Sequence, residues 1–156
     1  MRFNTQFPVA VHTVMVIATR PKGRKATSEG ISRSTGSNPV IIRNLFSSLK
    51  KAGIITVSAG KCGGTCLAKS PEDITLWDIY TAVQSEETDD IFKFHANVSP
   101  RCPVGSNIHQ VLLPHFDDAV RALKEELSKV NLQSLLGELN EVIATKESLS
   151  EADLAI

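Results

Sequence analysis

Apolar residues recur every three or four positions along the first twenty residues and mark one face of a helix. The spacing predicts a helix over residues 3–19, whose regular part begins near Pro8 because proline is tolerated only in a first turn. His12 lies on this otherwise apolar helix and is expected to be a core histidine with a satisfied hydrogen bond. A basic, glycine-containing segment over residues 20–25 then ends the helix.

A second pattern, beginning at Ser28, is typical of a helix-turn-helix. Its fourth position is apolar, its fifth is the small Ser32, its ninth is Gly36, and apolar residues follow at the fifteenth and eighteenth positions. The small residue lets the second helix cross closely, and the glycine permits a tight turn with positive φ. Thr27 or Ser28 is expected to cap the first helix.

The second helix of the pair has clear start and stop signals. Asn38 is expected to cap it, Pro39 to occupy its first turn, and Gly53 to end it. A β-hairpin is predicted directly after it, because a β-branched segment, a glycine-rich turn and a second short segment follow in order. This hairpin is interpreted as a wing, with these three parts at residues 54–58, 60–64 and 65–68.

Helical periodicity returns twice in the second half of the chain. A helix is predicted over residues 75–84, with Asp73 or Thr75 as its cap, and residues 85–105 are expected to be irregular. A helix with a single apolar stripe follows over residues 106–130, and Pro114 should kink it or split it. A helix this long exceeds what so small a core can bury, so a partner helix, most simply from a second copy, should cover it.

The C-terminal residues predict a short helix over 132–143, with an acidic segment from about Lys146 that is expected to fray. A chain of 156 residues fits one domain. We therefore expect a mainly α fold with a small β-wing, a winged helix-turn-helix joined to a long dimerisation helix. The expected organisation is a winged helix-turn-helix region at 1–84, an irregular loop at 85–105, dimerisation helices at 106–146 and an acidic tail at 147–156; the family resemblance given below implies that the first region binds DNA and that the loop is of a sensor type.

The net charge of zero conceals two opposite halves. Residues 1–70 contain eleven Lys and Arg against one acid, Glu29, a net charge of +10, and residues 71–156 carry six basic against sixteen acidic residues, a net charge of −10. The basic half is a plausible nucleic-acid surface, although a solvated face without a partner is an equal alternative on charge alone. Neither a membrane span nor a signal peptide is present in the pattern, so a cytoplasmic location is expected.

Several short motifs follow one another in a specific order along the chain. They are TSEGI at 27–31, NPVIIR at 38–43, LKKAGI at 49–54, the glycines at 60, 63 and 64, LA at 67–68, and ITLWDI at 74–79. Taken in this order, over roughly residues 1–135, they resemble the Rrf2 family of bacterial winged helix-turn-helix regulators. The resemblance implies a homodimeric transcriptional regulator, usually a repressor, that binds a palindromic operator in double-stranded DNA and is not an enzyme.

The helix-turn-helix suggests which residues would contact DNA. Arg43, on the second helix, is the best candidate for a base or phosphate contact, against the alternative of a solvated arginine. In the wing, where the family commonly places an arginine, this chain has Ala59, and Lys61 is the only substitute. The other candidates for base or phosphate contact are Arg24, Lys25, Thr27, Ser28, Arg33, Ser37, Asn38, Ile41 and Asn44.

The three cysteines decide whether a metal or a redox centre is expected. Iron-sulfur members of the family place three cysteines before the long helix, whereas this chain has only Cys102 there, which resembles the cluster-free branch. No cofactor and no metal are therefore expected. Cys102 is either a reactive thiol, stabilised by Arg101 and a helix amino terminus, or an ordinary buried cysteine. Cys62 and Cys66 should lie on opposing arms of the hairpin, close enough to bridge.

Three other functions remain as alternatives. The first is an iron-sulfur-sensing regulator, and the second is a dimeric effector or scaffold module that has lost DNA affinity. The third is a cysteine-dependent enzyme using Cys102 with His95 or His109, which lacks a phosphate loop and an oxyanion signature. The signal, whether a small molecule or an oxidant, is left open.

Overall fold

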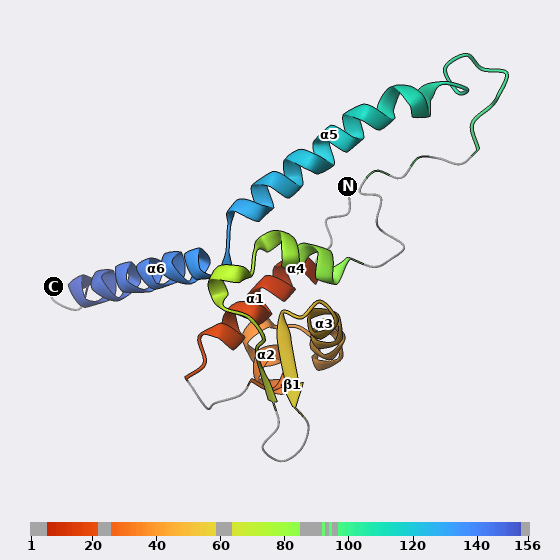
Figure 1. Ribbon diagram of the computed structural model, residues 1–156. Coiled ribbons are helices and arrows are strands. Elements are labelled where there is room, and N and C mark those ends of the chain that lie inside the picture. The colour runs from red at the N-terminus through yellow and green to blue at the C-terminus, as the bar shows by residue number, and fades with distance from the viewer. Residues whose placement is uncertain are drawn as a thin grey trace.

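The computed structural model describes residues 6–21, 26–58, 64–84, 92, 94 and 97–153, with residues 148–153 described by their backbone alone. Figure 1 shows α1 to α4 and a two-stranded hairpin gathered into one body, from which α5 and α6 diverge. The expected mainly helical fold with a small wing is confirmed. The elements are α1 (Gln6–Ala18), α2 (Ser28–Thr35), α3 (Pro39–Lys51), β1 (Ile55–Ser58), β2 (Gly64–Leu67), the 3₁₀ turn η1 (Pro71–Asp73), α4 (Leu76–Val83), α5 (Ile108–Lys129) and α6 (Leu132–Asp153).

The hydrophobic core lies between α1, α2, α3 and α4. Ile31 of α2, Ile42 and Leu49 of α3, and Ile79 of α4 have at most 1% of their surface exposed. Burying one such side chain stabilises the fold by roughly 1.5–3 kcal/mol relative to leaving it in water. The core therefore fixes the relative positions of the two helices of the predicted helix-turn-helix.

The first helix buries a different face from the one that its spacing predicted. The apolar spacing predicted a stripe of Phe3, Phe7, Val11, Val14, Met15 and Ala18, of which Phe3 lies outside the described residues. Among the other five only Val14 is buried, and the core side of α1 is completed by Ala10, Thr13 and Ile17. Almost every residue of α1 is apolar, so its period does not distinguish an inner from an outer face. His12 is exposed, and the expectation of a core histidine was wrong.

The turn between α2 and α3 has the geometry that its glycine predicted. Gly36 adopts the left-handed conformation, with φ 68° and ψ 9°, and its amide donates to the carbonyl oxygen of Ser32 at 2.9 Å. The Ser32 hydroxyl reaches across the turn to the carbonyl oxygen of Ser37 at 2.6 Å. These bonds satisfy polar groups in the turn, as half-buried backbone requires.

The hairpin of β1 and β2 is antiparallel, and Ile55 pairs with Leu67 at its base. Thr65 also exchanges two backbone hydrogen bonds with Ala26, of 3.2 and 2.9 Å, which joins the hairpin to the segment that enters α2. The wing is therefore held to the helix-turn-helix by backbone bonds as well as by packing. The predicted glycine-rich turn, with Lys61 and Cys62, lies outside the described residues.

The start of α4 and the junction of α5 with α6 are bonded to each other. Thr75 rather than Asp73 caps α4, in a reciprocal capping box with Asp78. The amide of Leu76 donates to the carbonyl oxygen of Val130 at 2.9 Å. The amide of Leu132 donates to the carbonyl oxygen of Ile74 at 2.8 Å. Through these two bonds the C-terminal helices are anchored to the body.

The C-terminal helices differ from expectation in two ways. Of the two alternatives for Pro114, a split is excluded, because Pro114 lies inside a continuous α5 and the loss of one amide donor leaves the other hydrogen bonds of the helix in place. The last helix runs to Asp153 instead of ending near Ile143, because the acidic segment contains good helix formers and neither glycine nor proline. Among the described residues, no helix is long and apolar enough to cross a membrane.

Replacing Gly36 by alanine should lower the free energy of unfolding by about 1 kcal/mol, because an L-residue is strained at this positive φ. A Cβ at Gly36 would meet no atom within 4 Å, so the cost is conformational and not steric. Gly137, exposed within α6 and equally free of neighbours, is the matched control, and Gly137→Ala should raise stability by about 0.5–1 kcal/mol. Urea denaturation of both variants measures the difference. Equal effects would contradict the strained turn.

Candidate nucleic-acid interface

The outward face of α3 is the surface that the helix-turn-helix presents. Ile42, Leu45, Phe46 and Leu49 of this helix are buried in the core. The remaining side chains of its first half point away from the body, and two of them are apolar β-branched residues that are normally buried. These outward residues are Val40 (55% exposed), Ile41 (43% exposed), Arg43 and Asn44.

The predicted caps are confirmed, and they explain how the two helices begin. The Thr27 hydroxyl accepts from the amide of Gly30 at 3.1 Å, and the Asn38 side chain accepts from the amide of Val40 at 2.8 Å. Both cap side chains are exposed, so each stands at a helix start where free amides favour an anion. Ser28 and Ser37 are half-buried beside these caps.

Arg43 does not extend freely into solvent. Its Nη2 lies 3.3 Å from Oε1 of Glu29, which belongs to the first turn of α2, and 59% of each side chain is exposed. Hydrogen bonds from its own backbone amide, from Arg43 and from Ser28 hold the pKa of the Glu29 carboxyl below its ordinary value. Glu29 is therefore ionised at neutral pH, and the ion pair bridges the two helices.

Two further arginines approach the first turn of α2 with their side chains, Arg33 from the last turn of the same helix and Arg20 from the segment after α1. Arg33 is exposed, and its Nε donates to the carbonyl oxygen of Glu29 at 3.5 Å. Arg20, at the end of α1, places its Nη2 3.4 Å from where a Cβ at Gly30 would stand. Neither Arg20 nor Val40 was among the candidates predicted from the sequence. Val40 could have been found, because it falls outside the three-and-four spacing of the buried α3 residues.

The structure brings together most of the predicted contact residues. The segment from Thr27 to Arg33 lies beside the first turns of α3, where Ile41 and Arg43 project. At the far end of the same helix, Lys50 and Lys51 are exposed and extend the basic surface. Arg24, Lys25 and Lys61 lie outside the described residues.

Cys102 lies in a tight turn ahead of α5. Figure 1 shows the segment that leads into α5 well apart from α3. Its side chain is exposed, and its Sγ accepts from the amide of Gly105 at 3.4 Å. The buried alternative for this cysteine is therefore wrong. Phe92 stacks on Phe116 of α5 with ring centroids 4.4 Å apart, which holds part of the preceding segment against the helix.

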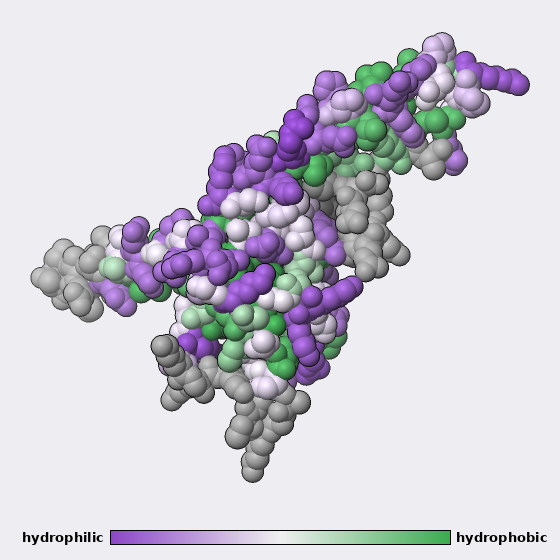
Figure 2. Space-filling model, in the orientation of Figure 1, coloured by the Kyte–Doolittle hydropathy of each residue, from purple (hydrophilic) through white to green (hydrophobic). Residues whose placement is uncertain are grey.

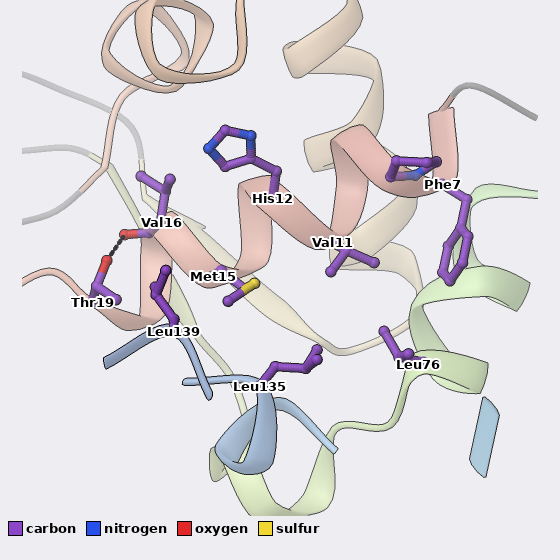
Figure 3. Close-up of a pocket in the computed structure, with 10 residues that line it drawn as sticks. Phe7, Val11, His12, Met15, Val16, Thr19, Leu76, Leu135 and Leu139 are labelled. Atoms are coloured by element: carbon purple, nitrogen blue, oxygen red, sulfur yellow. Dashed lines mark hydrogen bonds between the residues drawn. The ribbon is translucent and has the colours of Figure 1, made fainter. Parts of the chain in front are cut away.

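An apolar groove of about 540 Å³ runs along the outer side of α1. In Figure 3, Val11 and Met15 of α1 point toward Leu135 of α6, while His12 points from another side of the helix. The Nε2 of His12 lies 3.2 Å from the hydroxyl oxygen of Ser34, so the rim of the groove contacts α2. The groove is separate from the outward face of α3.

The comparisons with known proteins agree on one family. A family model described as "Rrf2: Iron-dependent Transcriptional regulator" matches residues 3–138. A protein of Bacillus subtilis (strain 168), named as an HTH-type transcriptional regulator, YwnA, is 38% identical over 136 residues, which is 87% of this chain and 98% of the relative. The match extends from α1 into α6, and so includes every element from α1 to α5 and the first residues of α6.

Two solved structures extend the likeness to three dimensions. A protein of Lactobacillus plantarum, described as a transcriptional regulator, has a TM-score of 0.73 and 26% identity, and the match covers 94% of this chain and 97% of that one. IscR of T. potens has a TM-score of 0.67 and 20% identity, over 91% and 90% of the two chains. At 20% identity the second comparison supports the fold alone.

The family description names iron, which requires a group of side chains able to bind a metal ion. Within that part of the chain, no group of three or more His, Cys, Asp and Glu side chains could hold a metal ion. Cys66 lies in the wing and Cys102 lies before α5, and both are free thiols. The described residues therefore do not fit an iron site, and Cys62 and His95 lie outside them.

Proposed function

The chain belongs to the Rrf2 family of DNA-binding transcriptional regulators, and we propose that it acts as a homodimeric repressor on a palindromic operator. A regulator of this kind works where the chromosome is, so the proposal includes a cytoplasmic location. Repression follows from steric exclusion, because a dimer bound over a promoter blocks access by RNA polymerase. The enzyme alternative is set aside, since the family and the relatives are transcriptional regulators.

One observation supports operator binding more than any other. The first half of α3 exposes two apolar side chains, an arginine and an asparagine, while its opposite face is wholly committed to the core. Apolar side chains suit thymine methyl groups, arginine suits guanine, and asparagine suits adenine in the major groove. The half of the chain that carries this surface has a net charge of +10, which supplies the phosphate attraction.

Dimerisation is proposed from α5. No residue of this 22-residue helix is buried, and Val111 and Leu113 are 58% and 51% exposed. Figure 2 shows apolar residues along α5 amid polar ones. A second copy that covers this surface would place two α3 helices on one face of the DNA, as a palindrome requires.

The proposed function is tested by selecting duplexes from a random pool with the purified protein. A DNA-binding repressor should enrich a palindrome whose affinity exceeds that for scrambled duplex by about 10³-fold or more. The measured affinity should fall steeply with salt, because phosphate contacts release counterions. Enrichment of no sequence would favour the scaffold alternative.

Arg43→Ala should weaken binding to the selected operator by about 1–3 kcal/mol, roughly 5-fold to 150-fold, because one base contact in the major groove is lost. Fluorescence anisotropy titration measures the affinity. Arg121→Ala, on α5, removes the same charge from an exposed arginine outside the helix-turn-helix and should leave it unchanged. Equal losses in the two variants would refute base contact by Arg43.

Val111→Glu should convert the protein to a monomer, because a charge placed in the α5 interface would lose its hydration on pairing. Sedimentation velocity measures the oligomeric state, and operator affinity should fall together with it. The neighbouring exposed Gln110→Glu adds the same charge beside the stripe and should leave the dimer intact. A dimer that survives Val111→Glu places the interface elsewhere.

A redox-responsive form of this repressor is a second candidate. Cys102 is exposed and free, and its Sγ accepts a hydrogen bond from the backbone amide of Gly105. Hydrogen peroxide would convert the thiolate form of this cysteine to a sulfenic acid with release of hydroxide. The segment that carries it leads directly into α5, so a change there acts on the proposed dimer interface.

Peroxide should lower the operator affinity of the wild type and leave that of Cys102→Ser unchanged, because the variant lacks the oxidised thiol. Anisotropy titration before and after treatment gives the comparison. Cys66→Ser removes the other free thiol of the described residues and should respond like the wild type. A full response in Cys102→Ser would discard this cysteine as the sensor.

A further inference from the structure

The ion pair between Glu29 and Arg43 stands out because of where its acid lies. Glu29 is the single acidic residue among the first 70, in a half that otherwise carries eleven basic residues. It lies in the first turn of α2, and its Oε1 is 3.3 Å from Nη2 of Arg43 on α3. A negative charge at this position faces any phosphate that approaches the helix-turn-helix, so its presence needs a reason other than attraction to DNA.

The contribution of this ion pair to folding stability does not explain its presence. Both side chains are 59% exposed, and ion pairs this exposed contribute little to folding. The carboxylate is nevertheless held, because its Oε1 accepts a hydrogen bond from Nη2 of Arg43 at 3.3 Å. Arg33 donates to the backbone carbonyl of Glu29 and leaves the carboxylate to Arg43. Arg43 is therefore the arginine whose side chain the Glu29 carboxylate holds.

The ion pair changes both the orientation of the Arg43 guanidinium and its attraction to phosphates. A guanidinium has five N–H donors in a rigid plane, so the contact at Nη2 orients the plane and leaves other donors for a second acceptor. The pair is neutral overall, which weakens the attraction of Arg43 to phosphates at any sequence. A guanine edge, which offers two acceptors without a full charge, is affected less than a phosphate.

We propose that Glu29 is a positioning residue for base recognition, which orients Arg43 toward the major groove and prevents it from serving as a general phosphate anchor. The inference rests on the proposed operator binding. It assigns to Glu29 a gain in specificity at the expense of affinity for unrelated DNA. A binding site can discriminate by penalising the wrong contact as well as by favouring the right one.

The test compares Glu29→Gln with the wild type on the selected operator and on a scrambled duplex, each at several salt concentrations. Glu29→Gln should bind the scrambled duplex more tightly. The slope of log affinity against log salt should steepen by about one, because Arg43 then neutralises a phosphate. The ratio of operator to scrambled affinity should fall by about fivefold or more.

Two variants control for charge and for indirect effects. Glu72→Gln removes the same charge from an exposed acid in η1, away from α3, and should leave the affinity ratio unchanged. In an Arg43→Ala background, Glu29→Gln should no longer alter the ratio, because the residue that it positions is gone. Circular dichroism of each variant establishes that α2 is still folded.

The outcomes distinguish a failure of this inference about Glu29 from a failure of the proposed function. A wild type that discriminates operator from scrambled DNA, with Glu29→Gln behaving like Glu72→Gln, overturns this inference and leaves the proposed function standing. An equal loss on both duplexes with an unchanged salt slope also overturns it, since it indicates a structural role. A wild type that fails to discriminate overturns the proposed function and this inference with it.

Discussion

The orientation of α3 is fixed by the burial of one of its faces, and the rest of the proposed interface depends on this constraint. Ile42 and Leu49 have 0% of their surface exposed and are held against α2 and α4. A helix whose one face is immobilised in a close-packed core has no freedom to rotate. The residues between the buried positions, Ile41 and Arg43 among them, must therefore face outward whatever their own chemistry.

Much of this arrangement could be predicted from local rules. The glycine at position 36, the caps at Thr27 and Asn38, and the hairpin after α3 each depend on short-range backbone preferences that one sequence records. The face of α1 could not be predicted, because a helix that is apolar on all sides gives no period to follow. The length of α6 follows helix propensity and not net charge, because its acidic last part contains good helix formers and neither glycine nor proline.

The location of the candidate site on α3 could be predicted from the sequence, but the ion pair within it could not. The helix-turn-helix pattern located Arg43 on the outward face, as the structure has it. That Glu29 lies within 3.3 Å of it depends on the crossing of α2 and α3, and two residues fourteen positions apart carry no local signal of contact. The same crossing decides which donors of Arg43 would remain for DNA, so the specificity proposed for this site would be a tertiary property.

The C-terminal helices are linked to the proposed DNA surface through intervening elements of the described chain. The junction of α5 and α6 is bonded to the residues that flank the start of α4, and α4 packs on both α1 and α3. His12 of α1 then contacts Ser34 of α2 at 3.2 Å. A displacement of α5 that altered α3 would have to move α4, whose Ile79 is buried in the common core. Because such a core resists gradual deformation, the two α3 helices of a dimer would shift as whole bodies, and their spacing on DNA would change before their internal geometry did.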